Sequence, residues 1–115
     1  MTLTKEQAIE NHRKMWNWIA DETLKRKRVV RKDEYFIEKG ISVVQCWCYC
    51  CEYSTDNSYI DCDKCPIQWK NGLCEAGEYD DWRAACFKEN YKKAAKLARI
   101  IANLPESKYI ADGGK

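Results

Sequence analysis

Hydrophobic positions in the first third of the chain recur every three or four residues. Thr4 followed three positions later by Gln7 has the pattern of a helix capping box, and no Gly or Pro follows until Gly40. The pattern predicts a long helix that ends in the basic residues 25–28, because cations suit the negative end of the helix dipole. Its apolar stripe comprises Ala8, Ile9, His12, Met15, Trp16, Ile19, Thr23 and Leu24.

The next segment, 31–40, predicts a shorter helix with Gly40 as its C-terminal stop. The apolar portion of this helix is Tyr35, Phe36 and Ile37. Residues 41–44 are β-branched enough to form a short strand. The turn-forming residues at 54–58 predict a hairpin over 47–62.

A second long helix is predicted from about Tyr79 to Asn103, where Leu104 and Pro105 end it. Its stripe is rich in alanine, which lets another helix approach closely, and comprises Ala84, Phe87, Tyr91, Ala94, Ala95, Ala98, Ile101 and Ala102. A different face carries the cations Lys88, Lys92, Lys96 and Arg99.

These elements predict a mainly α, small α+β fold. In this expected fold two long helices pack antiparallel, and a short helix and a small hairpin lie across one end. The length of 115 residues fits one domain over 1–105, made of a helical region over 1–40, a cysteine-rich region over 46–74 and the helix 79–103. Residues 106–115 have no periodicity and are expected to form a flexible tail.

Charge is nearly balanced over the whole chain but unevenly distributed. The net charge is +2, which calls for neither nucleic acid nor membrane. Ten bases and seven acids in 1–45 give +3, two and six in 46–78 give −4, and eight and five in 79–115 give +3. No signal-peptide pattern opens the chain, and no apolar run approaches the roughly 18 residues of a membrane span. A cytoplasmic protein with reduced thiols is therefore expected.

Seven of the eight cysteines lie between residues 45 and 74. Cys48 and Cys51 form one C-x2-C pair, and Cys62 and Cys65 form another after ten intervening residues. Two thiolates three positions apart can hold one ion from a single turn, and two such turns complete the sulfur cage of a structural zinc. The small hairpin of the predicted fold is therefore expected to be zinc-stabilised. In an extended strand Cys51 would point away from Cys48, so this pair needs a turn. Cys74 or Cys46 is an alternative ligand.

Other chemistry is less well supported by the sequence. Several cysteines could be buried thiols without metal, or disulfides if the protein were extracellular. The adjacent Cys50 and Cys51 lack the βαβ context of a redox motif. The only histidine, His12, lies on the apolar stripe and fits a packed residue better than a base or ligand. With no convergent acid, base and nucleophile, a non-enzymatic protein is expected.

Two sets of side chains are candidate interaction sites. Aromatic anchors of protein interfaces are expected close to the cysteines, at Trp47, Tyr49, Tyr53, Tyr59 and Trp69. Phosphate contacts are possible at the basic run, although such a run is more often a solvated helix end: Lys25, Arg26, Lys27, Arg28, Arg31 and Lys32.

The spacing of cysteines, aromatics and the last helix resembles that of small uncharacterised cysteine-rich proteins encoded by phages and prophages of Gram-positive bacteria. The resemblance covers most of the chain, including the segment from Gln7 to Asp21, and rests on Cys48, Cys51, Cys62, Cys65, Pro66, Trp69, Cys74, Tyr79 and Trp82. It implies a bacterial cytoplasm, bound zinc and an accessory role in modulating a host or phage complex. Cys46 and Cys50 depart from the pattern, which leaves the ligand set open.

The expected function is that of a small zinc-binding protein whose loop-rich surface binds a protein partner. One alternative is nucleic-acid binding through the basic helix faces, although the acidity of the cysteine segment opposes a zinc-ribbon mode. A weaker alternative is a nucleotide or small-molecule binder that uses the aromatic cluster.

Overall fold

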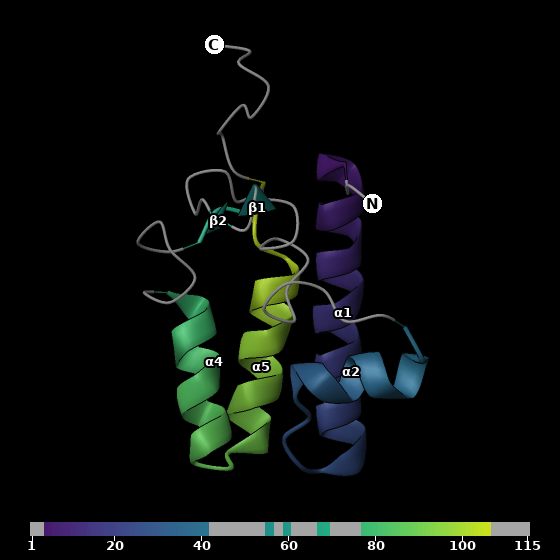
Figure 1. Cartoon of the computed structure of the whole chain (residues 1–115). Coiled ribbons are helices and arrows are strands. Elements are labelled where there is room, and N and C mark those ends of the chain that lie inside the picture. Colours follow the sequence, from purple (N-terminus) through teal and green to yellow (C-terminus); the bar gives the residue numbers. More distant parts are fainter. Residues whose placement is uncertain (1–3, 42–54, 57–58, 61–66, 70–76, 107–115) are drawn as a thin grey trace.

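The described portion of the computed structural model is mainly helical, as predicted (Figure 1). It comprises residues 4–41, 55–56, 59–60, 67–69 and 77–106. The elements in chain order are α1 (Lys5–Arg26), α2 (Lys32–Lys39), β1 (Thr55–Asp56), β2 (Tyr59–Ile60), α4 (Glu78–Phe87) and α5 (Tyr91–Ala102).

Helix α1 begins and ends where the sequence predicts. The backbone N–H of Thr4 donates to the side chain of Gln7 at 2.9 Å, and the N–H of Gln7 donates back to the Thr4 hydroxyl at 3.1 Å, so the predicted capping box is confirmed. The helix ends at Arg26, within the basic run, and Lys27 follows in the left-handed conformation with φ 54°. The predicted stripe is buried except at Leu24, which is 51% exposed.

A short turn leads into α2. The buried N–H of Val30 donates to the hydroxyl of Thr23 at 3.3 Å, which ties the turn to the last turn of α1. Gly40 stops α2, as predicted, because it adopts a left-handed φ of 64° that costs glycine little. Tyr35 and Phe36 are buried, whereas Ile37 is 72% exposed.

The span from Tyr79 to Asn103, predicted as one long helix, instead contains two, α4 and α5. Residues 88–90 separate α4 from α5, Glu89 takes a left-handed φ of 56°, and the Asn90 side chain accepts from the N–H of Lys93 at 3.2 Å as an N-cap. Because of this break, the side chains that α4 buries differ from those of the predicted stripe. Phe87 is 87% exposed, while α4 instead buries Trp82, Ala85 and Cys86.

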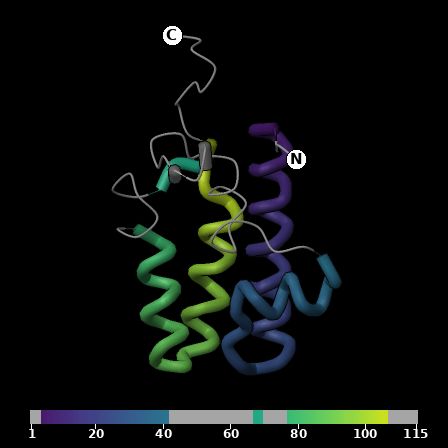
Figure 2. The backbone as a smooth tube through the Cα atoms, in the orientation of Figure 1, coloured from purple at the N-terminus to yellow at the C-terminus, as the bar shows by residue number. Residues whose placement is uncertain are grey.

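Helix α5 lies between α4 and α1 (Figure 2). His12 hydrogen-bonds near the end of α5 at Ile101, whereas Asn17 hydrogen-bonds two residues earlier at Arg99. Residues later in α1 therefore contact residues earlier in α5. The alanine row of α5 faces the interior, which allows this close packing: Ala94, Ala95, Ala98 and Ala102.

The core extends to a short segment between the cysteine pairs and α4. Ile67 forms a β-bridge with Glu106, and the N–H of Gln68 donates to the Pro105 oxygen at 2.9 Å. Trp69 is 3% exposed. We call 67–69 the anchor segment, because its backbone and two of its side chains fix it to the helices.

A two-residue antiparallel pair lies inside the region where the sequence predicts a hairpin. Thr55 pairs with Ile60, and Asp56 pairs with Tyr59. The zinc-binding component of that prediction and the strand predicted at 41–44 fall on residues outside the described ranges, apart from Ile41. The tail predicted at 106–115 also lies outside them, except for Glu106.

Candidate functional site

The predicted metal ligands lie outside the residues that the structure describes. This holds for Cys48, Cys51, Cys62 and Cys65 and for the alternatives Cys46 and Cys74. The zinc site therefore stays a prediction. Over the described ranges, no group of three or more His, Cys, Asp or Glu side chains could hold a metal ion.

The structure does show how the cysteine segment joins the helical frame. The anchor segment begins at Ile67, two positions after Cys65, and its Trp69 ring meets the His12 ring edge-on at 5.9 Å. Tyr79, at the start of α4, lies 6.5 Å from the same indole ring. The second C-x2-C pair is thus followed directly by a segment held in the core.

Burial of Trp69 corrects its predicted role. The sequence placed it among exposed aromatic anchors for a partner, but at 3% exposure it packs in the interior and is not available to one. Of the other predicted anchors, Tyr59 is described only through its backbone pairing in β2. Trp47, Tyr49 and Tyr53 fall outside the described ranges.

Ion pairs occupy two members of the predicted phosphate-binding run. Arg26 donates to both carboxylate oxygens of Glu38 at 2.6 and 2.7 Å and to Glu22 at 2.9 Å. Arg28 donates to Glu34 at 2.8 Å. These hydrogen bonds lower the pKa values of Glu38 and Glu34 from their usual range. Arg26 therefore fastens α2 to the end of α1, and Arg28 fastens α2 to the turn between the two helices, so neither guanidinium forms an open phosphate site.

The remaining cations of the run are placed differently. Lys25, Lys27 and Arg31 are exposed. The ammonium of Lys32 lies 4.4 Å from the centre of the Tyr79 ring, and the Arg83 guanidinium lies 5.2 Å from it. Tyr79 in turn stacks on Trp82, with ring centres 5.8 Å apart. A hollow of about 310 Å³ adjoins this cation and aromatic group.

His12 and Cys86 are sealed in the interior. His12 is fully buried and hydrogen-bonds the Ile101 oxygen, so the prediction that it packs is confirmed. Burial raises the pKa of the Cys86 thiol to about 11. Both side chains are almost completely buried and the Cys86 thiol stays protonated at neutral pH, which does not favour either as a base or nucleophile.

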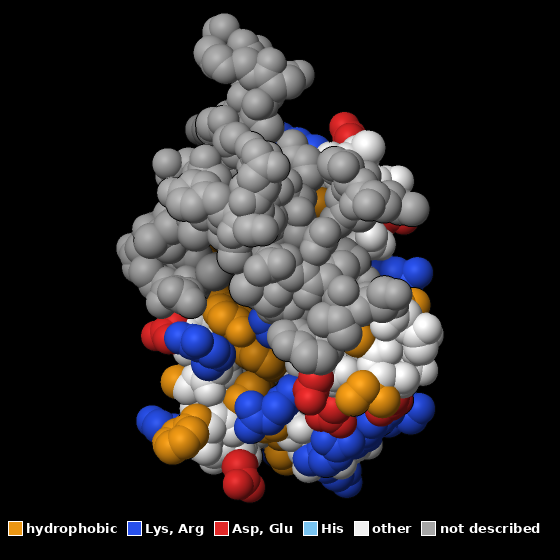
Figure 3. Space-filling view, in the orientation of Figure 1, with side chains coloured by type: hydrophobic (Ala, Val, Ile, Leu, Met, Phe, Trp, Pro, Cys, Tyr) orange, Lys and Arg blue, Asp and Glu red, His pale blue; other side chains and the backbone are white. Residues whose placement is uncertain are grey.

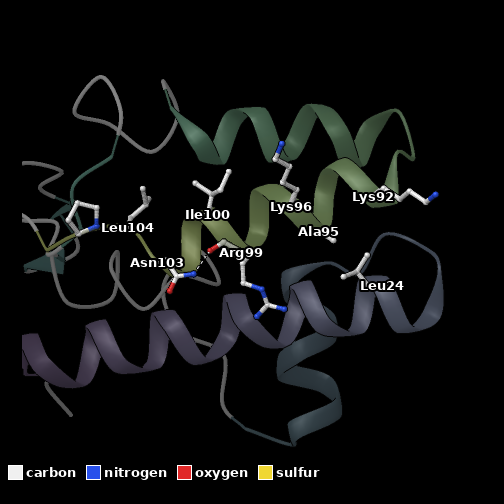
Figure 4. Close-up of a pocket in the computed structure, with 9 residues that line it drawn as sticks. Leu24, Lys92, Ala95, Lys96, Arg99, Ile100, Asn103 and Leu104 are labelled. Atoms are coloured by element: carbon white, nitrogen blue, oxygen red, sulfur yellow. Dashed lines mark hydrogen bonds between the residues drawn. The ribbon is translucent and has the colours of Figure 1, made fainter.

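A groove along α5 was not predicted as such, although its cations belong to the basic helix face named for the nucleic-acid alternative. It has a volume of about 560 Å³ and is lined by Leu24 and by residues of α5 and the segment after it, including Lys92, Lys96 and Ile100 (Figure 4). The sequence predicted that Leu24 would be buried, so an exposed apolar groove that it lines was not expected. The signal that could have found it was the lysine row at 88, 92 and 96.

Exposed apolar side chains are not confined to that groove. On the face drawn in Figure 3, hydrophobic side chains lie among Lys and Arg side chains. Besides Leu24 and Ile100, which line the groove, the large exposed hydrophobic side chains among the described residues are Ile37, Ile41 and Phe87. Such side chains are candidates for contact with another molecule.

None of the described helices is both long enough and apolar enough to cross a membrane. No family model, curated protein or solved structure matches the chain.

Proposed function

We infer that this chain is a non-enzymatic, zinc-binding protein of the bacterial cytoplasm. In this proposal it is a phage or prophage accessory protein that binds and modulates a host or phage protein. Cys48, Cys51, Cys62 and Cys65 hold a structural zinc, whose thiolate cage leaves no open coordination position for catalysis. The metal's role is to order the cysteine segment on the helical frame.

The anchor segment is the observation that carries this proposal. Ile67 and Trp69 are buried, and Gln68 hydrogen-bonds the backbone after α5, so the chain is fixed immediately beyond the second C-x2-C pair. A metal that joins the two pairs would tie the rest of the segment to this fixed point. Because such a site does not exist in the unfolded chain, its binding free energy adds to the folding free energy.

Zinc content of the purified protein tests the metal component of the proposal. We expect about one equivalent of zinc by mass spectrometry, and loss of helicity or of thermal stability when a chelator removes it. A content below about half an equivalent, with helicity unaffected by chelator, would contradict the proposal.

Neighbouring cysteines supply a matched control. Cys51→Ser removes a proposed ligand, whereas Cys50→Ser changes an adjacent thiol that the proposal leaves uncoordinated. We expect the first variant to lose zinc and the second to retain it. Equal zinc content in both variants would contradict the assignment of Cys51, and not Cys50, as a zinc ligand.

Partner binding needs a separate measurement. Zinc-loaded protein is immobilised and incubated with bacterial host lysate, and bound proteins are identified by mass spectrometry. Chelator-treated protein is the control, because loss of the ordered segment should release a partner that contacts it. Recovery of no specific protein under either condition would contradict the binding role.

Nucleic-acid binding is the alternative, favoured by the charge of α5. This helix carries Lys92, Lys93, Lys96 and Arg99 and no acidic residue. Binding to DNA or RNA would weaken steeply between low and physiological salt, because each neutralised phosphate releases counterions. Absence of binding at low salt removes this alternative.

A further inference from the structure

The groove along α5 combines an apolar floor with fixed walls. Ala95 and Leu104 are buried at its base, while Leu24 and Ile100 remain 51% and 41% exposed. Figure 4 shows Leu24 across from α5 and Ile100 farther along that helix. An apolar surface of this kind gains free energy when a partner covers it.

Hydrogen bonds hold the two helices that form the groove in register. The Arg99 guanidinium donates to the Asn17 side chain at 2.6 Å and also pairs with Asp21, both on α1. The Asn103 side chain donates to the Arg99 backbone oxygen at 2.9 Å. The groove is therefore preformed, which lowers the ordering cost of binding. The charge of Arg99 is matched internally by Asp21.

Lysines supply the unmatched charge. Lys92 and Lys96 line the groove, are exposed, and make no ion pair within the described ranges. Their spacing of four residues places them about 6 Å apart along the helix axis. No carboxylate is among the described residues that line the groove. The groove is thus apolar along its floor and positive along one edge.

We propose that this groove binds an acidic, amphipathic helix of a protein partner. The proposal rests on the protein-binding function proposed above and specifies its surface and the chemistry of its partner. Apolar side chains of the partner, repeated at three and four residues, would cover Leu24 and Ile100. Carboxylates one helical turn apart would match Lys92 and Lys96, which steers association and favours acidic partners over basic ones.

Charge and apolarity together disfavour two other occupants. A second copy that met this face through its own α5 would bring four cations against four, with no acid in either helix. Nucleic acid would satisfy the lysines but would leave Leu24 and Ile100 without an apolar partner. Both occupants remain distinguishable outcomes of the test.

A random peptide library, displayed and selected on the zinc-loaded full chain, tests the proposal without assuming a partner sequence. Peptides of about four helical turns suffice to span such a groove. We expect enriched peptides to be net acidic, with apolar residues at helical spacing. Their affinities are measured by fluorescence anisotropy against four variants.

The variants form two matched pairs. Leu24→Ser and the double change Lys92→Gln with Lys96→Gln alter the groove, whereas Ile37→Ser and Lys93→Gln alter an exposed isoleucine on α2 and a lysine of α5 outside it. We expect each groove variant to raise Kd by about three- to tenfold, from lost apolar area or lost charge pairing. The two control variants should bind as the unaltered protein does.

Four results would overturn the proposal: no enriched peptide, basic peptides, peptides without an apolar pattern, or affinities equal in groove and control variants. Lysine-dependent binding of DNA that is insensitive to Leu24→Ser would also overturn it, as would a dimer in sedimentation that Leu24→Ser dissociates. If zinc is present and lysate capture succeeds but groove variants capture the same protein equally, the groove proposal alone fails.

Discussion

Nε2 of His12, a fully buried side chain between α1 and α5, lies 3.0 Å from the backbone oxygen of Ile101. A carbonyl oxygen only accepts, so Nε2 carries a proton and donates. The residue four positions after Ile101 is Pro105, which has no N–H to give. The His12 imidazole therefore donates to the Ile101 oxygen from another helix. The N–H of Leu104 donates to the same oxygen at 3.3 Å.

Loss of this contact should be costly. We expect His12→Ala to lower the free energy of unfolding by about 2–4 kcal/mol, because it removes a buried hydrogen bond and leaves a cavity beside Trp16 and Trp69. Urea denaturation followed by tryptophan fluorescence measures the change. Asn11→Ala, at the preceding and partly exposed position, is the control and should change stability by less than about 0.5 kcal/mol. Equal stability of the two variants would contradict the role assigned to the imidazole.

The turn after α1 gives a second test. Thr23→Val keeps the side-chain shape but leaves the buried N–H of Val30 without its 3.3 Å acceptor, which should cost about 1–3 kcal/mol. Thr23→Ser keeps the hydroxyl and loses one methyl group, so its cost should be smaller, about 1 kcal/mol. Chemical denaturation ranks the pair, and the reverse order would show that the hydroxyl does not hold the turn.

Backbone conformation predicts two substitutions that stabilise the protein. Lys27 and Glu89 both have positive φ, at 54° and 56°, where a side chain is strained and glycine is not. Lys27→Gly and Glu89→Gly should each raise the free energy of unfolding by up to about 1 kcal/mol. Ala84→Gly, within α4, should instead lower it by about 1 kcal/mol. Thermal denaturation distinguishes the signs, and destabilisation by Glu89→Gly would refute this interpretation of the 88–90 turn.

Acid should loosen α2 from α1. The pKa values of Glu34 and Glu38 are lowered by hydrogen bonds from Arg28 and Arg26, so each pair stabilises the fold above the ordinary glutamate pKa. That stabilisation disappears as the pH falls through the lowered pKa values of the two glutamates. Melting temperatures from neutral pH to pH 3 should therefore fall less for the double variant Glu34→Gln with Glu38→Gln. An equal fall in melting temperature for the unaltered protein and the double variant would show that these ion pairs do not cause the loss of stability in acid.

Cys86 should resist alkylation while the protein is folded. It is buried, and its pKa is raised to about 11, so almost no accessible thiolate exists at pH 8. Iodoacetamide treatment followed by peptide mass mapping should find Cys86 unmodified in native protein and modified in denaturant. Rapid modification of the native form would show that α4 opens readily.

Local signals predicted the N-terminal helices well. The capping box at Thr4 and the left-handed stop at Gly40 are made by residues within a few positions of each other, so the sequence contains all the information needed. The break between α4 and α5 was missed because helical periodicity continues across it. Asn90 was the available signal, since Asn is a favoured N-cap.

Tertiary contacts explain the other differences. Leu24 fits the apolar stripe of α1 by spacing, but the stripe extends beyond the packed interface and leaves it at the groove. Trp69 looked like an exposed anchor because nothing local shows that it meets His12. Arg26 was assigned to phosphate although Glu22, four positions earlier on α1, was a local signal of an ion pair, and its other partner, Glu38, lies on the next helix. Spacing along one segment does not reveal what a second segment covers or neutralises.

Packing of Trp69 against His12 has a thermodynamic consequence for the rest of the chain. If a ligand bound by the cysteine segment raises the equilibrium constant for packing of the Trp69 ring, then packing of the ring must raise the affinity for that ligand by the same factor. Trp69→Ala would then weaken zinc affinity although the indole is no ligand, and zinc would stabilise the α1 and α5 interface from outside it. The free energy of zinc binding would thus depend partly on the packing of helices that contain none of the proposed zinc ligands.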